Sequence, residues 1–208
     1  KLGAASWSER LAKYLRLDAY AIVKDAFSES KTVQEINYFS QEQDDEYREN
    51  KEKSSQFFSL GKVKLRYDNL NDWDVQTNIL AKYADAGIIE RTISRSASEN
   101  IFFNDRNDSR SFSLTNVNSI NKKFSYKHTL SINTNFEYSE KENNFDWLFN
   151  QPIFNEIIPI VETPNEDINL LKNNSSSSQL FQLDAKHYWV LNNTNHLYPS
   201  AGINYLNK

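Results

Sequence analysis

Hydrophobic and polar positions alternate most clearly in the stretch 124–138, FSYKHTLSINTNFEY. One parity is mostly apolar and the other is wholly polar, over a length greater than the ~5–6 residues of an ordinary globular strand. Since side chains alternate across a strand, one face of this stretch meets an apolar environment and the other meets water. Between residues 126 and 138 the apolar parity begins and ends with tyrosine and has aliphatic residues between. This order predicts a strand of a membrane-spanning β-barrel, whose apolar wall is flanked by aromatic rings.

The same alternation recurs along the chain and predicts about eight strands. Their expected ranges are 1–8, 14–24, 56–68, 73–84, 111–120, 124–138, 180–191 and 196–206. Three of these strands supply the residues expected to face the membrane, which are Val75, Ile79, Tyr83, Tyr126, Leu130, Ile132, Phe136, Tyr138, Phe181, Leu183 and Trp189. Pro199 cannot donate a hydrogen bond to a neighbouring strand, so we expect the last strand to be bulged or unpaired there.

The connections between the predicted strands alternate in length. Short turns are expected near 9–13, 69–72, 121–123 and 192–195, and long connections at 25–55, 85–110 and 139–178. An up-and-down outer-membrane barrel has short periplasmic turns on one rim and longer extracellular loops on the other. The predicted fold class is therefore all-β: an antiparallel up-and-down transmembrane β-barrel, as a fragment or about eight strands of a larger barrel, with long extracellular loops.

Residues 7–27 allow two interpretations. As a helix, Trp7, Leu11 and Tyr14 fall three or four apart, and Ser6 with Glu9 forms a capping box. As strands, the stretch 14–23 alternates and matches the rhythm of the hairpins downstream. We expect strands, with the helix as the alternative.

The composition narrows the class of protein. The chain has 208 residues, a mean hydropathy of -0.73, no Cys and no Met. No window approaches the ~18 consecutive apolar residues of a transmembrane helix, whereas a barrel strand needs only ~9–11 residues. The net charge of -4 comes from interspersed acids and bases without a basic stripe, so nucleic acid is not an expected partner. The missing Met and the absence of a visible signal peptide favour an excerpt of a longer chain.

Nothing in the sequence predicts an enzyme, a cofactor or a metal site. Without Cys, thiolate chemistry and disulfides are excluded. We expect packing or interfacial roles for His128, His187 and His196, because they are far apart in sequence and two of them lie on apolar parities. The acidic run 44–46 lacks the spacing and the glycine of a calcium loop. Neither a nucleophile elbow nor a phosphate-binding glycine loop is present.

Three stretches resemble the barrel of TonB-dependent receptors from Bacteroidota: YLRLDAYAIV, SLGKVKLRYDNLNDWDVQTNILAKYADAG and NSINKKFSYKHTLSINTNFEYSEKEN. The resemblance implies energy-coupled import of a scarce nutrient across the cell outer membrane, whether a siderophore, cobalamin, an oligosaccharide or a peptide. It implies the lipid bilayer, TonB and a surface lipoprotein as partners, and loops exposed to the extracellular side. No plug domain is visible, so residues 1–208 are expected to form one barrel segment.

The same resemblance places the ligand against extracellular loops within 40–54, 95–110 and 141–178. Trp147, Phe149 and Phe154 are the candidate ligand-binding residues there, because aromatic rings in loops can stack on a ligand.

Two other functions remain open from the sequence. A barrel with a structural or secretion role would share the fold. A soluble secreted β-sandwich that acts as a carbohydrate-binding module would instead bury the apolar parity against a second sheet. The two folds differ in where the apolar face ends, because a membrane wall has an apolar band about 25 Å tall around its outside.

Overall fold

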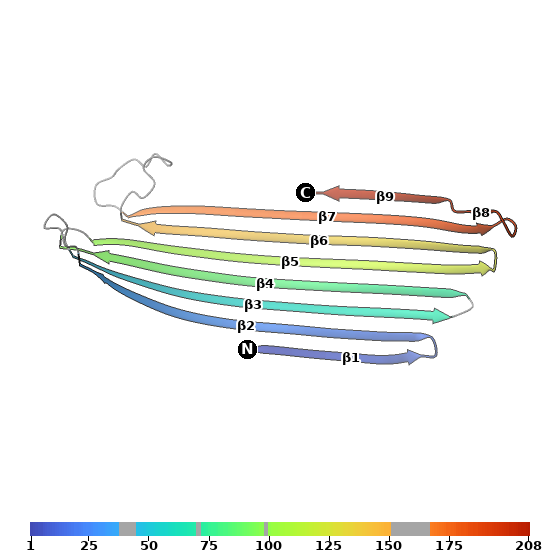
Figure 1. Cartoon of the computed structure of the whole chain (residues 1–208), viewed down its shortest axis with the longest axis horizontal. Coiled ribbons are helices and arrows are strands. Elements are labelled where there is room, and N and C mark those ends of the chain that lie inside the picture. Colours follow the sequence, from blue (N-terminus) through green and yellow to red (C-terminus); the bar gives the residue numbers. More distant parts are fainter. Residues whose placement is uncertain (38–44, 70–71, 98–99, 151–166) are drawn as a thin grey trace.

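The computed structural model describes residues 1–37, 45–69, 72–97, 100–150 and 167–208, which form one antiparallel sheet of nine strands (Figure 1). The strands are β1 (Leu2–Ala12), β2 (Leu15–Ile36), β3 (Glu46–Asn69), β4 (Trp73–Arg95), β5 (Asn100–Ser125), β6 (His128–Phe149), β7 (Ile168–Val190), β8 (His196–Leu197) and β9 (Ser200–Asn207). Each strand from β1 to β8 pairs with the next one along the chain, and β9 pairs with β7. The predicted all-β, up-and-down fold is confirmed. No helix in the described ranges is long and apolar enough to cross a membrane.

The six strands β2 to β7 are much longer than the sequence pattern predicted. They have 22 to 26 residues each, which corresponds to roughly 73–86 Å at ~3.3 Å per residue. Most of the described residues in the connections expected at 25–55, 85–110 and 139–178 are therefore strand. In the middle connection, β4 continues to Arg95 and β5 begins at Asn100. These loop assignments were wrong because the outer parts of the strands show no clear alternation. Some are polar on both faces, as in 172–178, and others carry apolar residues on both faces, as at Ile88 and Ile89.

Two short turns lie a few residues from their predicted places. The first is at Lys13–Tyr14 instead of 9–13, after a bulge that shifts the register between Arg10 and Ala12. The third is at Tyr126–Lys127 instead of 121–123, because β5 continues to Ser125. Tyr126 therefore lies in a turn and not on a strand face.

Residues 121–123 stay in β5 because they pair with residues 129–131 of β6. The ammonium group of Lys122 hydrogen-bonds Asp72 and lies 4.4 Å from the centre of the Trp73 ring. Polar residues at this position therefore did not mark a turn.

The other turns agree with the sequence pattern. Asp72 N donates to Asn69 O at 2.9 Å across the β3–β4 connection, whose residues 70–71 lie outside the described ranges. In the turn at 192–195, Asn192 Oδ1 accepts from the backbone N–H of Asn195 at 2.8 Å, as expected of an asparagine that stabilises a turn through its own side chain.

Both ends of the chain form strands. β1 pairs with β2 in a regular ladder that sets Trp7 opposite Ala19, so the strand interpretation of residues 7–27 is confirmed and the helix is wrong. The last predicted strand is interrupted between β8 and β9, at Tyr198–Pro199. Pro199 accepts a hydrogen bond from His187 N at 2.9 Å but donates none, which confirms the predicted irregularity.

The register assigns the strand residues to two faces. One face carries the odd-numbered residues of β2, β3, β4, β7 and β9, and those of β1 up to its bulge. It also carries the even-numbered residues of β5 and β6. We call this the apolar face and the opposite one the polar face. One row of successive Cα partners across the apolar face is Val63, Ile79, Asn116, Phe136 and Phe181.

The sheet has almost no core of its own. Among the described residues only Phe149 is buried, while Trp7, Val63 and Ile79 on the apolar face are 49%, 41% and 38% exposed. A sandwich would cover this face with a second sheet, but the described residues form a single sheet. Exposed apolar surfaces of this kind mark a contact with a membrane or with another protein.

Candidate functional site: two faces of one sheet

A row of aromatic rings crosses the apolar face about midway along the long strands. Phe57 and Tyr83 have ring centres 6.0 Å apart, and Phe112 and Tyr138 have ring centres 6.1 Å apart. Tyr83 and Phe112 are Cα partners, so the row spans β3 to β6 without a gap. We call these four residues the distal aromatic row, since they lie on the side away from the short turns.

A second aromatic group lies on the apolar face next to the short turns. Tyr14 meets Tyr67 edge-on at 6.4 Å between ring centres. Trp73 opens β4 and lies under the ammonium group of Lys122. We call Tyr14, Tyr67 and Trp73 the proximal aromatic group.

Two histidines extend the proximal end of the apolar face onto β6 and β7. The rings of His128 and His187 stack with centres 5.6 Å apart, and the ring of Trp189 lies 5.3 Å from His128. The described residues contain no group of three His, Asp or Glu side chains that could hold a metal ion. The rings of His128 and His187 pack against each other and against Trp189 in this cluster.

The two aromatic levels enclose an apolar band of membrane dimensions. Trp73 and Tyr83 lie ten positions apart on β4, which is roughly 33 Å along a strand and roughly 23 Å in height at the ~45° tilt of a barrel strand. The hydrophobic band of outer-membrane barrels is about 25 Å tall. Beyond Tyr83 the same face of β4 changes character, with Asp85 and Arg91 on the apolar parity.

Polar side chains inside this band satisfy one another. Thr77 Oγ1 donates to Asn118 Oδ1 at 2.8 Å, and Asn118 Nδ2 donates to Thr134 Oγ1 at 2.9 Å and also contacts Asn116 Oδ1. In a hydrocarbon environment no water is available to hydrogen-bond such groups. The hydrogen bonds among these side chains of β4, β5 and β6 offset the free-energy cost of placing polar groups on an apolar face.

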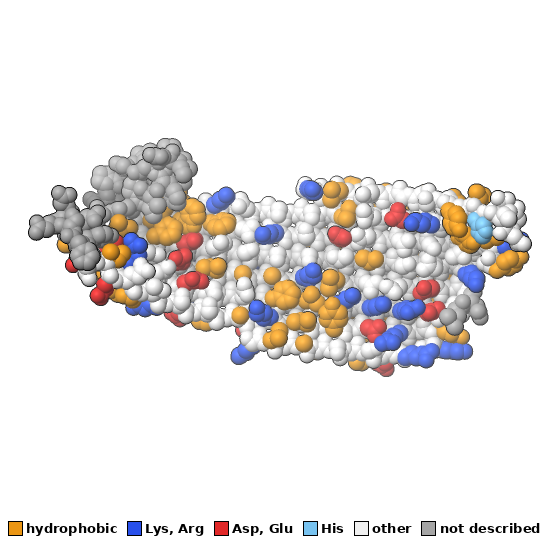
Figure 2. All heavy atoms as spheres, in the orientation of Figure 1, with side chains coloured by type: hydrophobic (Ala, Val, Ile, Leu, Met, Phe, Trp, Pro, Cys, Tyr) orange, Lys and Arg blue, Asp and Glu red, His pale blue; other side chains and the backbone are white. Residues whose placement is uncertain are grey.

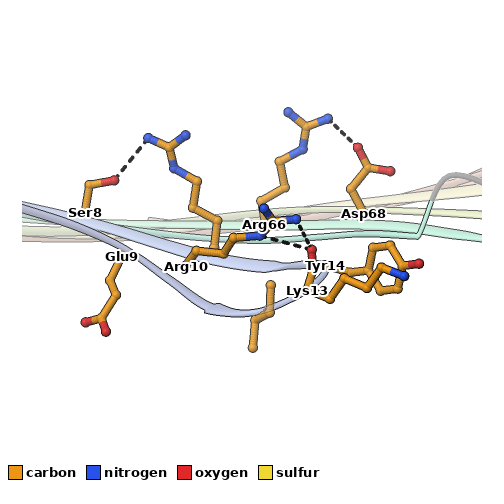
Figure 3. A pocket seen from close by; sticks show the side chains of 9 residues that line it. Ser8, Glu9, Arg10, Lys13, Tyr14, Arg66 and Asp68 are labelled. Carbon is orange, nitrogen blue, oxygen red and sulfur yellow. Dashed lines mark hydrogen bonds and ion pairs between the residues drawn. The ribbon is translucent and has the colours of Figure 1, made fainter.

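One group of charged side chains on the polar face lies near the short turns. Arg16 pairs with Asp18 at 2.9 Å and Arg66 pairs with Asp68 at 3.1 Å. Arg16, Arg66 and Asp68 border a hollow of about 580 Å³. In Figure 3, Arg66 and Asp68 project to one side of the strands and Glu9 to the other, as the parity requires. Figure 2 looks onto the polar face and shows the charged side chains gathered over β1 to β3 at this end.

An aromatic cluster lies at the opposite end of the polar face. The rings of Phe103 and Phe149 are 6.2 Å apart, and Trp147 Nε1 donates to Asp105 Oδ1 at 2.9 Å. We call Phe103, Asp105, Trp147 and Phe149 the distal cluster. In Figure 2 hydrophobic side chains gather at this end of the face.

The structure thus brings together two of the three aromatic candidates. Trp147 and Phe149 are on β6 and not in a loop, while Phe154 lies outside the described residues. Sequence reasoning missed Phe103 and Asp105 because both were assigned to the connection 85–110. Their position opposite Phe149 and Trp147 depends on the β5–β6 register, which no local pattern specifies.

A polar hollow lies beside the distal cluster. Thr32, Gln34, Arg48, Asn50 and Thr92 line a cavity of about 170 Å³. It borders the cluster because Thr92 is the Cα partner of Phe103.

One atom of this hollow has no hydrogen-bond partner. Asn50 Nδ2 donates to Glu90 Oε1 at 2.8 Å, whereas Asn50 Oδ1 is buried and unpaired in the part of the chain that the structure describes. A buried acceptor without a partner costs free energy, about 1–3 kcal/mol.

The fold that these faces define is an antiparallel, up-and-down transmembrane β-barrel wall. The chain is similar in structure to the RagAB peptide transporter, with a TM-score of 0.55 and 11% sequence identity, over 99% of this chain and 27% of that chain. This likeness shows the fold. From the coverage, the chain spans about a quarter of the length of that protein.

Two further solved structures match with TM-scores below 0.5. The siderophore receptor PiuA from Acinetobacter baumannii has a TM-score of 0.29 and 8% identity, over 99% of this chain and 42% of that chain. The ferric-catecholate import receptor Fiu from K12 E. coli has a TM-score of 0.26 and 9% identity, over 96% and 42%. No protein-family model matches the chain, and no curated protein matches it either.

Proposed function

We propose that the chain is a section of the barrel of an outer-membrane, TonB-dependent nutrient receptor, and that its apolar face contacts the bilayer. The observation that carries the proposal is the apolar band enclosed by the distal aromatic row and the proximal aromatic group, because its height of roughly 23 Å is close to that of a barrel wall. The protein is a transporter and not an enzyme. TonB and a surface lipoprotein belong to this proposal as partners.

The expected membrane-facing residues fit this orientation with one exception. Tyr126 lies in a turn. The other ten share the apolar face and are the proposed bilayer contacts: Val75, Ile79, Tyr83, Leu130, Ile132, Phe136, Tyr138, Phe181, Leu183 and Trp189. The short turns then lie on the periplasmic rim, and the far ends of the strands reach the extracellular side.

The polar face becomes the lumen, with the distal cluster at its extracellular end. Two features of this end favour a peptide ligand. The rings of Phe103 and Trp147 offer surfaces for apolar side chains. Asp105 and Glu90 place negative charge beside the rings, which disfavours an anionic ferric siderophore. The structurally similar RagAB is itself a peptide transporter.

The proposal is tested with the full-length protein produced in an outer membrane. The probe is a tryptic digest of an unrelated protein, and the peptides retained by the purified receptor are identified by mass spectrometry. We expect the receptor to fractionate with the outer membrane, to change its gel mobility on boiling, and to retain peptides.

A matched pair of variants separates ligand binding from folding. Trp147→Ala should weaken peptide retention about tenfold, since a stacked ring contributes of the order of 1.4 kcal/mol. Trp189→Ala removes the same side chain from the apolar face and should leave retention unchanged. Equal retention by both variants would overturn the ligand site. A protein that fractionates as soluble would overturn the barrel.

A further inference from the structure

Beyond the distal aromatic row, three basic residues face each other across adjacent strands. Lys31 of β2 is the Cα partner of Lys51 of β3, and Lys51 is also the Cα partner of Arg91 of β4. All three lie on the apolar face, the side that the proposed function turns toward the membrane. Like charges directly opposite each other destabilise a strand pair. We call these three residues the basic row.

The carboxylates nearby neutralise the basic row only in part. Glu49 accepts from Lys51 at 2.7 Å and from Lys31 at 3.1 Å, so one carboxylate serves two ammonium groups. These hydrogen bonds lower the pKa of Glu49 to about 2, which keeps the carboxylate charged. No ion pair joins Arg91 to any residue in the described ranges. The basic row therefore keeps an excess of positive charge.

The side chains of the row are open to a ligand. Those of Lys31 and Lys51 are 50% and 46% exposed. Arg91 can form two parallel hydrogen bonds to a phosphate, while lysine attracts it as a compact charge. Three cations in register on one face of a sheet form a surface that suits a phosphorylated ligand.

The height of the basic row above the distal aromatic row determines how long a lipid headgroup must be to reach it. Lys51 lies six positions beyond Phe57 on β3, which is roughly 20 Å along the strand and roughly 14 Å in height at a ~45° tilt. Ordinary lipid headgroups extend only about 5–8 Å beyond the hydrocarbon on each side. A ligand anchored in the membrane must therefore extend further to reach the row.

We propose that Lys31, Lys51 and Arg91 bind phosphate groups on the saccharide headgroup of an anionic glycolipid in the outer leaflet. The inference rests on the proposed function, because the latter sets which face meets the membrane. The bound lipid would neutralise the repulsion within the row and tie the extracellular ends of β2, β3 and β4 to the membrane surface.

The test uses the full-length protein in nanodiscs of phosphatidylcholine. The probes are purified lipopolysaccharide with a phosphorylated core, the same material after enzymatic dephosphorylation, and phosphatidylglycerol. The amount retained per protein is measured over a titration. We expect phosphorylated lipopolysaccharide to bind at least tenfold more tightly than either of the other two.

Variants connect this binding to the row. K51Q/R91Q should weaken lipopolysaccharide binding at least tenfold. The control K62Q/K64Q removes two positive charges from the polar face of β3 and should bind like the unsubstituted protein. E49Q should tighten binding several-fold, since it frees Lys31 and Lys51, whereas a row that merely forms ion pairs would show no gain.

The outcomes separate this inference from the proposed function. Equal binding of phosphatidylglycerol, or no loss in K51Q/R91Q, would overturn the glycolipid site while peptide retention in the same nanodiscs stayed intact. Failure of the protein to enter nanodiscs would overturn the barrel, and the glycolipid site with it.

Discussion

Tyr83 on β4 lies directly opposite Phe112 on β5. This pairing joins the Phe57–Tyr83 contact to the Phe112–Tyr138 contact, so one aromatic row crosses four strands at a single level. On the short-turn side of this level the face is mostly apolar, and beyond it the face is mostly charged or polar. Aromatic rings at such a boundary are typical of the interface between membrane and water.

The first prediction concerns the coupling between these two residues. In a double-mutant cycle, Tyr83→Ala and Phe112→Ala should show a coupling of about 0.5–1.5 kcal/mol, the usual range for aromatic pairs. Urea unfolding of the protein in lipid vesicles gives the four free energies. Tyr83→Phe is the control, because it keeps the ring and removes only the hydroxyl bond to Asp85. Purely additive losses would show that the row has no internal contact energy.

The second prediction compares neighbouring residues on opposite faces. Ile79 lies in the middle of the apolar band and Leu80 lies on the polar face. Ile79→Arg should destabilise the barrel in lipid by about 2–4 kcal/mol, the cost of a cation at the midplane of a barrel wall. Leu80→Arg should cost less than about 1 kcal/mol, since a luminal side chain stays in water.

A third position tests where along β4 the contact with the membrane ends. Ile89 shares the parity of Ile79 but lies beyond the distal aromatic row. Ile89→Arg should be nearly neutral in lipid vesicles. If all three substitutions cost the same, the apolar face does not contact hydrocarbon.

The sequence predicted the parts of the strands where the two faces differ. Alternation is strong between the aromatic levels, as in 128–138, because one face is apolar there. It disappears in segments such as 172–178, KNNSSSS, where both faces are polar. Those segments are strands because their neighbours in the sheet supply backbone partners, and this information is not local.

The sequence also predicted only part of the candidate site. Trp147 and Phe149 were chosen as aromatic residues in a polar region, which is a local feature. Their partners Phe103 and Asp105 are more than forty positions away in sequence and meet them only through the β5–β6 register. A single sequence does not contain that register where alternation is absent.

The third prediction tests the hydrogen bond between Trp147 and Asp105. Asp105→Ala should speed amide hydrogen exchange in the distal parts of β5 and β6 about tenfold, because loss of one acceptor costs about 1.4 kcal/mol. Asp105→Asn keeps an acceptor oxygen in place and should exchange like the unsubstituted protein. Identical rates in both variants would mean that the bond to the indole does not hold these strands together.

The last prediction concerns pH and the pair of lysines at Glu49. The pKa of Glu49 is lowered from 4.5 to about 2 by hydrogen bonds from Lys51 and Lys31. Since the folded-state pKa lies below the unfolded value, the charged carboxylate stabilises the fold above pH 4.5, and this contribution is lost as the pH falls toward 2. Amide exchange in β2 and β3, corrected for the intrinsic rates, should therefore accelerate across this window.

Two variants show whether Glu49 is responsible for that acceleration. Glu49→Gln should have a flatter profile between pH 5 and 2, with lower protection at the upper end, because it has no carboxylate to protonate. Glu29→Gln removes a carboxylate that pairs with Lys53 at 3.2 Å and leaves Glu49 in place, so it should keep the acceleration. If Glu49→Gln retained the full profile, other carboxylates would have to account for it, and the basic row would not depend on Glu49 for its balance of charge.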